Sequence, residues 1–283
     1  MTVSHVVRLA RAKLNLTLEV LGRRPDGYHE ICSIMQTIDL ADVLEAEEAP
    51  DLRLYCDQPH LAAEDNLAFR AARLLQERSS PGRGAILSLH KETPEAAGLG
   101  GGSSDAAAAL LALNDLWELG LTPEELMPLA AGLGSDVPFF VYGGTALASG
   151  RGEVLRRLPT LAGLWLVLAK PDLSLSNKTA TLYRGLMRGD FTDGRRSEET
   201  ARRIERGEGL APEAICNAFE RQAFALPAVQ RCLEALALAG ARDIHLAGSG
   251  PALFALCSDE AEARAVSEHV GAAGHWSRPA VTV

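Results

Sequence analysis

The sequence predicts an α+β fold with two lobes and a candidate binding site between them. Strand-like segments come in adjacent groups instead of alternating strictly with helices. A glycine-rich segment runs directly into a helical segment, and a Gly-Ser-Gly turn lies between two short strand-like segments near the end of the chain. Because 283 residues can bury a full core, the chain suits one large domain or two modest ones. We expect two domains, residues 1–155 and residues 156–283.

The first half of the chain begins with strands. Apolar and polar side chains alternate over residues 10–20, which predicts a strand with one buried face. Pro25-Asp26-Gly27 predicts a turn, and Pro123 favours the first turn of a short helix. The other elements expected here are strands at 31–38, 43–46, 52–56, 85–90 and 145–148, helices at 66–75 and 106–117, and a polar bend at 133–138.

The second half of the chain contains more helical segments. A dense apolar run at 164–169 predicts a buried strand. Residues 189–209 are rich in Arg, Glu and Gly, so we expect this segment to be exposed and assign it no role. The other expected elements are strands at 243–247, 252–257 and 280–283 and helices at 215–225, 228–239 and 260–271.

Composition and charge restrict the class of protein. A net charge of −9 argues against binding to nucleic acid or to a membrane surface, since both favour basic patches. The sequence has no apolar run of membrane-span length and no signal-peptide pattern. The five cysteines lack metal-binding spacing, so we expect reduced thiols and a cytoplasmic protein. Lysines are so scarce that each deserves scrutiny; they are Lys13, Lys91, Lys170 and Lys178.

The segment from Glu95 to Ala109, EAAGLGGGSSDAAAA, is the most informative part of the chain. Its glycines lack a Cβ atom, so the backbone can turn sharply and approach a ligand. Ser103, Ser104 and Asp105 are residue types preferred at helix N-caps. Free N–H groups at a helix N-terminus attract anions, so we expect this loop to hold a chain of phosphates. A flexible linker is the ordinary alternative.

Two known phosphate-binding patterns fit this loop less well. A P-loop needs Lys-Ser or Lys-Thr after its last glycine, where this chain has Ser-Ser-Asp. The dinucleotide-binding pattern is matched by Gly98 and Gly100, but Ser103 stands at its third glycine position. That pattern also places its glycines soon after a strand, whereas residues 91–94 separate the loop from the strand at 85–90. It is therefore a weak match.

Five other residues carry side chains suited to catalysis or binding. Lys13 and Asn15 share one face of the first strand, where they could contact phosphate and substrate or simply face solvent. Asp136 could accept a hydroxyl proton, or it could cap a helix or turn. Tyr28 and His29 follow the predicted turn and suit a flat ligand such as a nucleobase, although routine packing is the alternative.

Together these segments resemble the GHMP kinase superfamily over nearly the whole chain. The glycine loop identifies the superfamily, while Pro-Asp-Gly-Tyr-His at 25–29 separates the chain from mevalonate, homoserine and galactose kinases. The segments that resemble family motifs are 12–16 (AKLNL), 24–30 (RPDGYHE), 65–67, 71–72, 94, 97–107, 133–140 (LGSDVPFF), 215–220 (ICNAFE) and 247–251 (AGSGP). One segment departs, since Asn177 stands where the family often has Thr.

The resemblance implies a two-lobed GHMP kinase fold, with an N-terminal lobe like domain 2 of ribosomal protein S5 and a ferredoxin-like C-terminal lobe. It implies transfer of the γ-phosphoryl group of ATP, accompanied by Mg²⁺, to a hydroxyl of a small molecule that carries cytidine. Lys13 and Asp136 would be catalytic, and Asn15, Tyr28 and His29 would hold the cytidine end. The residues expected to bind ATP are Pro94, Glu95, Ala96, Ala97, Gly98, Leu99, Gly100, Gly101, Gly102, Ser103, Ser104 and Asn66. We expect no dedicated protein metal cluster, and a monomer or weak homodimer.

Three alternatives stay open from the sequence. The protein could be another small-molecule kinase of the superfamily, a nucleotide-binding protein without catalysis, or a dinucleotide-dependent oxidoreductase. The presence of both Lys13 and Asp136 argues against the second. The incomplete glycine pattern argues against the third.

Overall fold

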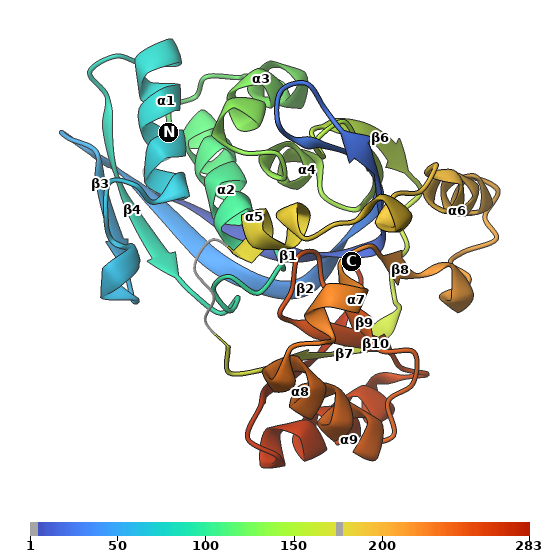
Figure 1. The fold of residues 1–283 in the computed structure, drawn as a ribbon. Coiled ribbons are helices and arrows are strands. Elements are labelled where there is room, and N and C mark those ends of the chain that lie inside the picture. Colours follow the sequence, from blue (N-terminus) through green and yellow to red (C-terminus); the bar gives the residue numbers. More distant parts are fainter. Residues whose placement is uncertain (1–4, 174–177) are drawn as a thin grey trace. The chain divides into compact units, whose positions relative to one another are not determined.

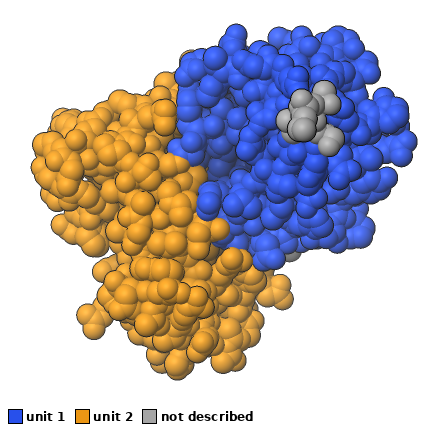
Figure 2. Space-filling model, turned by 180° about the vertical axis from the view of Figure 1, so that it is seen from behind, with its two compact units in different colours: residues 1–12, 40–95, 100–143 blue, residues 13–39, 96–99, 144–283 orange. Residues whose placement is uncertain are grey.

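A computed structural model describes residues 5–173 and 178–283 as an α+β fold with two sheets (Figure 1). The predicted fold class is therefore confirmed. The chain divides into two compact units (Figure 2). Unit 1 comprises residues 1–12, 40–95 and 100–143, and unit 2 comprises residues 13–39, 96–99 and 144–283. The boundary expected between residues 155 and 156 stays a prediction.

The larger sheet is built on two long strands, β1 (His5–Arg23) and β2 (His29–Ala49). The strand order is β3-β4-β2-β1-β8, and β5 pairs with both β2 and β6. The bounds of the other strands are Arg53–Cys56 for β3, Gly84–His90 for β4, Thr145–Ser149 for β5, Val154–Leu158 for β6 and Cys216–Asn217 for β8. The two strands expected at 31–38 and 43–46 are one continuous strand, because no Gly or Pro interrupts residues 39–42.

In unit 1 the described residues form four α-helices. These are α1 (Leu67–Ser79), α2 (Gly101–Leu116), α3 (Pro123–Leu133) and α4 (Val137–Tyr142). Helix α2 packs against the other three, and its run of Ala and Leu favours helix while burying most of its side chains. Helix α3 begins as Pro123 predicted, with a capping box in which Thr122 and Glu125 bond each other's backbone N–H groups.

The start of α2 corrects the sequence prediction. The helix begins at Gly101 and not at Ala106, because Gly100 takes the left-handed conformation (φ 78°) and occupies the N-cap position itself. Ser104 and Asp105, expected as N-cap types together with Ser103, therefore lie inside the helix. The side chains of Ser104 and Asp105 bond partners outside α2 instead.

Unit 2 contains a four-stranded sheet with the order β11-β7-β10-β9, in which every pairing is antiparallel. Its elements are β7 (Trp165–Lys170), α8 (Pro227–Leu238), β9 (His245–Leu246), β10 (Leu253–Leu256), α9 (Glu260–Ala272) and β11 (Trp276–Val281). A strand-helix-strand-strand-helix-strand sequence in this spatial order is ferredoxin-like, as the resemblance implied. Its core joins Val167 and Leu253 of the sheet to Val229 of α8 and Val266 of α9.

The described residues of unit 2 also form three shorter α-helices, and this part of the chain corrects two expectations. These helices are α5 (Lys178–Arg184), α6 (Arg195–Glu205) and α7 (Glu220–Ala223). Helix α6 lies in the segment expected to be exposed, yet Ser197 and Ala201 on its inner face are fully buried while Arg and Glu cover the outer face. The helix expected at 215–225 is only partly correct, since residues 216–217 form β8. Asn177 lies outside the described residues.

The first strand corrects a further expectation, because both of its faces are buried within unit 2. The polar side chains of Lys13, Asn15, Thr17 and Glu19 are no more exposed than 4%. Hence their face of the strand is not the exposed one that simple alternation predicts. Among the helices that the structure describes, none has the length and apolar character needed to cross a membrane.

Candidate active site

The glycine loop has a backbone conformation that requires glycine. Gly98 and Gly100 have φ angles of 87° and 78°, which L-residues with side chains rarely adopt, and Ala96 also has a positive φ of 49°. A Cβ atom at Gly98 would lie 2.0 Å from the carbonyl oxygen of Ala247 and 2.8 Å from the backbone nitrogen of Gly250. Residue 98 is therefore restricted to glycine twice over, by its φ angle and by its close approach to another backbone segment.

Backbone hydrogen bonds hold residues 96–99 of the loop on two sides within unit 2. The Lys13 N–H donates to the carbonyl oxygen of Leu99 at 2.9 Å. The Ala252 N–H donates to the carbonyl oxygen of Ala97 at 3.1 Å. A segment fixed to β1 and to the turn before β10 is not a flexible linker, so that alternative is excluded.

Lys13 and Asn15 lie beside the glycine loop in the same unit. Lys13 Nζ donates to Asn15 Oδ1 at 2.6 Å, and both residues are buried. A Cβ atom at Gly248 would lie 2.7 Å from Gly98 O, 3.2 Å from Asn15 Oδ1 and 3.3 Å from Lys13 Nζ. The structure thus brings together an ammonium group, an amide and two glycine turns that are far apart in the sequence.

A chain of buried hydrogen bonds continues from Asn15 along β1. Asn15 Nδ2 donates to Ser33 Oγ at 2.7 Å, and Ser33 Oγ donates to the Thr17 carbonyl oxygen at 2.5 Å. The hydroxyls of Thr17 and Ser197 are 2.7 Å apart, and the Ser197 N–H donates to Glu19 Oε2 at 2.7 Å. Asn15 is therefore held at both ends of its amide. Sequence reasoning missed Ser33 and Ser197, since neither belongs to a recognisable motif.

Tyr28 and His29 are neighbours with different surroundings in unit 2. Tyr28 is 51% exposed, and the guanidinium carbon of Arg151 lies 4.5 Å from the centre of its ring. The His29 ring is buried and stacks on Tyr183 at 4.8 Å between ring centres. Burial, and secondarily a nearby arginine, lower the pKa of His29, which favours the neutral imidazole. Tyr28 is therefore accessible to a ligand, whereas the His29 ring is packed against another aromatic side chain.

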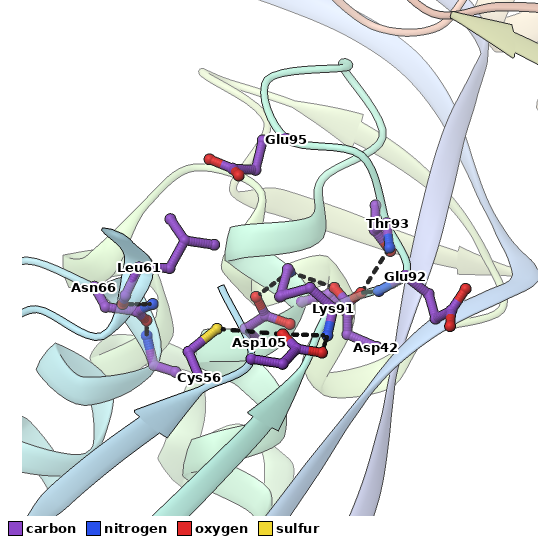
Figure 3. A network of polar contacts seen from close by, with 12 residues as sticks. Asp42, Cys56, Leu61, Asn66, Lys91, Glu92, Thr93, Glu95 and Asp105 are labelled. Atoms are coloured by element: carbon purple, nitrogen blue, oxygen red, sulfur yellow. Dashed lines mark hydrogen bonds and ion pairs between the residues drawn. The ribbon is translucent and has the colours of Figure 1, made fainter. Parts of the chain in front are cut away.

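Unit 1 contains a buried ion network at both ends of the glycine loop (Figure 3). Lys91 Nζ lies 2.5 Å from Asp42 Oδ2 and 2.6 Å from Asp105 Oδ2. Asp42 Oδ1 also accepts from the backbone N–H groups of Glu92 at 2.6 Å and Thr93 at 2.7 Å. We call Lys91, Asp42 and Asp105 the ion triad. The sequence marked Lys91 only through the scarcity of lysine, and it gave no sign of Asp42.

The surroundings of the ion triad shift the pKa values of Asp105 and Lys91. Burial raises the pKa of Asp105 to about 7; Lys91 opposes this rise and Asp42 adds to it. Burial by itself lowers the pKa of Lys91, but the two carboxylates outweigh burial and raise it. Lys91 thus stays charged at neutral pH, while Asp105 holds its proton far more tightly than an exposed aspartate does.

Two residues expected near ATP have well-defined partners in unit 1. Asn66 is the N-cap of α1: its Oδ1 accepts from the Ala68 N–H, and its Nδ2 donates to the Leu61 carbonyl oxygen, both at 2.8 Å. Its side chain thus joins the preceding turn to the helix. Glu95 Oε1 lies 2.8 Å from His60 Nε2 at the surface. Figure 3 shows both residues in the neighbourhood of the ion triad.

The remaining predicted residues lie at helix starts in unit 1. Residues 101–104 form the first turn of α2, and Ser104 Oγ donates to the Arg11 carbonyl oxygen at 2.7 Å. Asp136 is the N-cap residue of α4 and is partly exposed. Lys13 belongs to unit 2, so its pairing with Asp136 stays a prediction. Within residues 5–173 and 178–283, no three His, Cys, Asp or Glu side chains gather as a metal site.

Comparison with known proteins agrees with this fold and loop. The family models described as GHMP kinases N terminal domain and GHMP kinases C terminal match residues 66–144 and 210–275. The 4-diphosphocytidyl-2-C-methyl-D-erythritol kinase of Dehalococcoides mccartyi is 44% identical over 269 residues, 94% of each chain. The protein of that name from Pelotomaculum thermopropionicum is 46% identical over 268 residues, 93% of this chain and 92% of the relative.

A solved structure gives the same result. The crystal structure of a 4-(cytidine 5'-diphospho)-2C-methyl-D-erythritol kinase has a TM-score of 0.83 and 36% identity, and the match covers 98% of this chain and 99% of that one. The chain therefore belongs to the GHMP kinase family, whose members phosphorylate small molecules with ATP. Within that family, relatives that are 44–46% identical over 92–94% of this chain carry the name 4-diphosphocytidyl-2-C-methyl-D-erythritol kinase.

Proposed function

We propose that this protein transfers the γ-phosphoryl group of ATP to the 2-hydroxyl of 4-diphosphocytidyl-2-C-methyl-D-erythritol, in the non-mevalonate route to isoprenoid precursors. The observation that carries the proposal is the junction in unit 2 of Lys13, Asn15 and the glycine loop. The high identity to kinases of that name supports the choice of substrate. A different GHMP kinase activity is the alternative, but no feature of the site favours it.

The proposed roles follow from the needs of phosphoryl transfer. The reaction depends on positioning and on neutralising the charge that develops on the transferred group. The loop at residues 94–104 binds the triphosphate through the backbone N–H groups of the residues that follow Pro94, since this loop ends at the N-terminus of α2. Lys13 stabilises the developing charge, and its ammonium is oriented by Asn15. Asp136 accepts or orients the proton of the attacking hydroxyl.

The two nucleoside ends of the substrates meet different parts of the chain in this proposal. Tyr28 stacks on the cytosine ring, because its own ring is accessible and Arg151 fixes its orientation. His29 offers a ring nitrogen to the base, and Asn15 contacts the same substrate. Asn66 shapes the turn beside the adenine by capping α1.

We further propose that Mg²⁺ arrives with ATP and is held mainly by phosphate oxygens and water, since the described residues gather no ligand cluster of their own. We place the activity in the cytoplasm, where the five cysteines, unpaired in the structure, stay reduced. We expect a monomer or a weak homodimer, with residues 1–155 and 156–283 as its two domains.

An acceptor panel tests the proposal. ADP release is measured with ATP and, in turn, the cytidine diphosphate alcohol, mevalonate, homoserine and galactose. We expect turnover with the first acceptor and a product whose phosphorus couples to carbon 2 of the erythritol unit in NMR spectra. Equal or greater kcat/KM with another acceptor, or phosphate on another oxygen, would contradict the proposal.

A further inference from the structure

The ion triad joins the two ends of the glycine loop within unit 1 (Figure 3). Lys91 lies just before Pro94, where the loop starts, and Asp105 directly follows Ser104, where it ends. Asp42 comes from β2 and is fully buried. Because one ammonium contacts both carboxylates, the start of the loop, its end and the sheet are tied at a single point.

The ion triad also lies next to the first turn of α2. Asp42 accepts the backbone N–H groups of Glu92 and Thr93 and so fixes the approach to the loop. A Cβ atom on Gly101, the first residue of α2, would lie 3.0 Å from Thr93 Cγ2 and 3.5 Å from Asp42 Oδ2. The ion triad therefore lies against the helix turn whose free N–H groups we propose to face the triphosphate.

Stability alone does not account for the burial of three ionisable side chains at one point. Charged side chains lose hydration on burial, and apolar side chains of the same volume are often as stabilising as a buried ion pair. What the ion triad provides is geometry, since short charge-assisted hydrogen bonds fix both distance and direction. Two such bonds and two backbone bonds converge here on the chain segments that begin and end the loop.

We propose, building on the function proposed above, that Lys91, Asp42 and Asp105 are positioning residues that hold the glycine loop in its nucleotide-binding conformation before ATP arrives. A loop ordered in advance spends less of the binding free energy on its own ordering, so ATP binds more tightly. The ion triad acts through the loop backbone. Its effect is therefore confined to the nucleotide and does not extend to the alcohol acceptor.

Substitutions at Asp105 test this inference with little disturbance elsewhere. Asp105→Ala removes the tie at the end of the loop, leaves Lys91 paired with Asp42, and continues the alanine run at 106–109. Asp105→Asn keeps an acceptor for Lys91. Asp115→Ala is the matched control, because Asp115 lies on the same helix in an exposed pair with Arg8.

Three measurements on each full-length variant separate positioning from simple stability. Titration calorimetry gives the affinity for ADP and for a non-hydrolysable ATP analogue. Steady-state kinetics gives KM for ATP and for the alcohol. Hydrogen exchange reports the protection of the backbone amides of residues 95–104.

We expect Asp105→Ala to weaken nucleotide binding and raise KM for ATP at least about tenfold, with KM for the alcohol changed less than about twofold. Amide exchange in the loop should accelerate, Asp105→Asn should recover most of the affinity, and Asp115→Ala should behave as wild type. If Asp105→Ala does not fold, Asp105→Ser takes its place with the same expectations.

A lower melting temperature with unchanged nucleotide affinity would reduce the ion triad to a structural role and overturn the inference. If the wild type binds nucleotide in an Asp105-dependent manner but does not phosphorylate the cytidine alcohol, the proposed function fails and this inference stands.

Discussion

The buried carboxyl of Asp105 leads to a prediction about stability and pH. Its pKa is raised from the ordinary value of 3.8 to about 7, chiefly by burial. The folded protein thus holds this proton more tightly than the unfolded chain does. The corresponding stability is present in full below about pH 4 and is lost as the pH rises through about 7. Asparagine has the same shape and no titrating proton, so Asp105→Asn removes this dependence.

The size of the effect follows from the two pKa values. A pKa difference of one corresponds to about 1.4 kcal/mol, so a rise from 3.8 to about 7 corresponds to about 4 kcal/mol. Most of the loss accumulates between pH 4 and 7, where the unfolded chain ionises and the folded protein does not. Lys91 stays protonated throughout this range because its pKa is raised, so it does not change the pH range over which the stability is lost.

Urea unfolding at several pH values between about 4 and 8 measures this effect. The free energy of unfolding of the wild type minus that of Asp105→Asn should fall by about 4 kcal/mol across the range. Titrating groups far from residue 105 are common to both proteins and largely cancel in the difference. Asp115→Asn, an exposed control on the same helix, should give a nearly flat difference. A flat or rising curve for Asp105→Asn would refute the reasoning.

Three further predictions concern the candidate active site. Asp136→Asn should lower kcat at least about 10²-fold while ATP still binds in a nucleotide titration, and a near-normal rate would remove Asp136 from the mechanism. Tyr28→Ala should raise KM for the cytidine substrate more than it lowers kcat in steady-state assays, because it removes uniform binding; a pure kcat defect would speak against stacking. Gly98→Ala should lower the free energy of unfolding by at least about 2 kcal/mol in urea titrations, since its Cβ would strike the Ala247 carbonyl and its φ is 87°. Gly132→Ala, in an open position of α3, should not destabilise the protein.

Local patterns predicted the elements whose boundaries depend on local chemistry. The strand expected at 85–90 is β4 (Gly84–His90), and the helix expected at 260–271 is α9 (Glu260–Ala272). In the structure Asp259 is the N-cap of α9, and β4 buries Ala85, Leu87 and Leu89 on one face. The glycine loop was recognisable for a similar reason, because its backbone conformation restricts residue 98 to glycine whatever surrounds it.

Partners of buried polar groups were beyond the reach of such patterns. Asp42 and Lys91 are 49 residues apart, and Thr17 and Ser197 are 180 residues apart. Alternation along β1 separates its two faces but does not say what covers each one. In the folded protein, Ser33 and α6 cover the polar face of β1. The polar side chains of this face, which the sequence predicts to be exposed, are therefore buried and hydrogen-bonded. The same limit applies to Asp42, whose role depends on a loop that follows it much later in the chain.

The contacts of Lys13 and Lys91 give a physical reason why these positions hold lysine and not arginine. The chain has 28 basic residues, of which only four are lysines, yet both Lys13 and Lys91 have buried side chains at segments that touch the glycine loop. A lysine ammonium is a compact charge that can donate in three directions, whereas an arginine fork needs a wide planar acceptor. At Lys91 the two acceptors belong to different elements, β2 and α2, and each lies within 2.6 Å of one nitrogen. Arginine cannot reproduce that convergence without separating the strand from the helix, so a lysine at this point is part of how the loop keeps its shape.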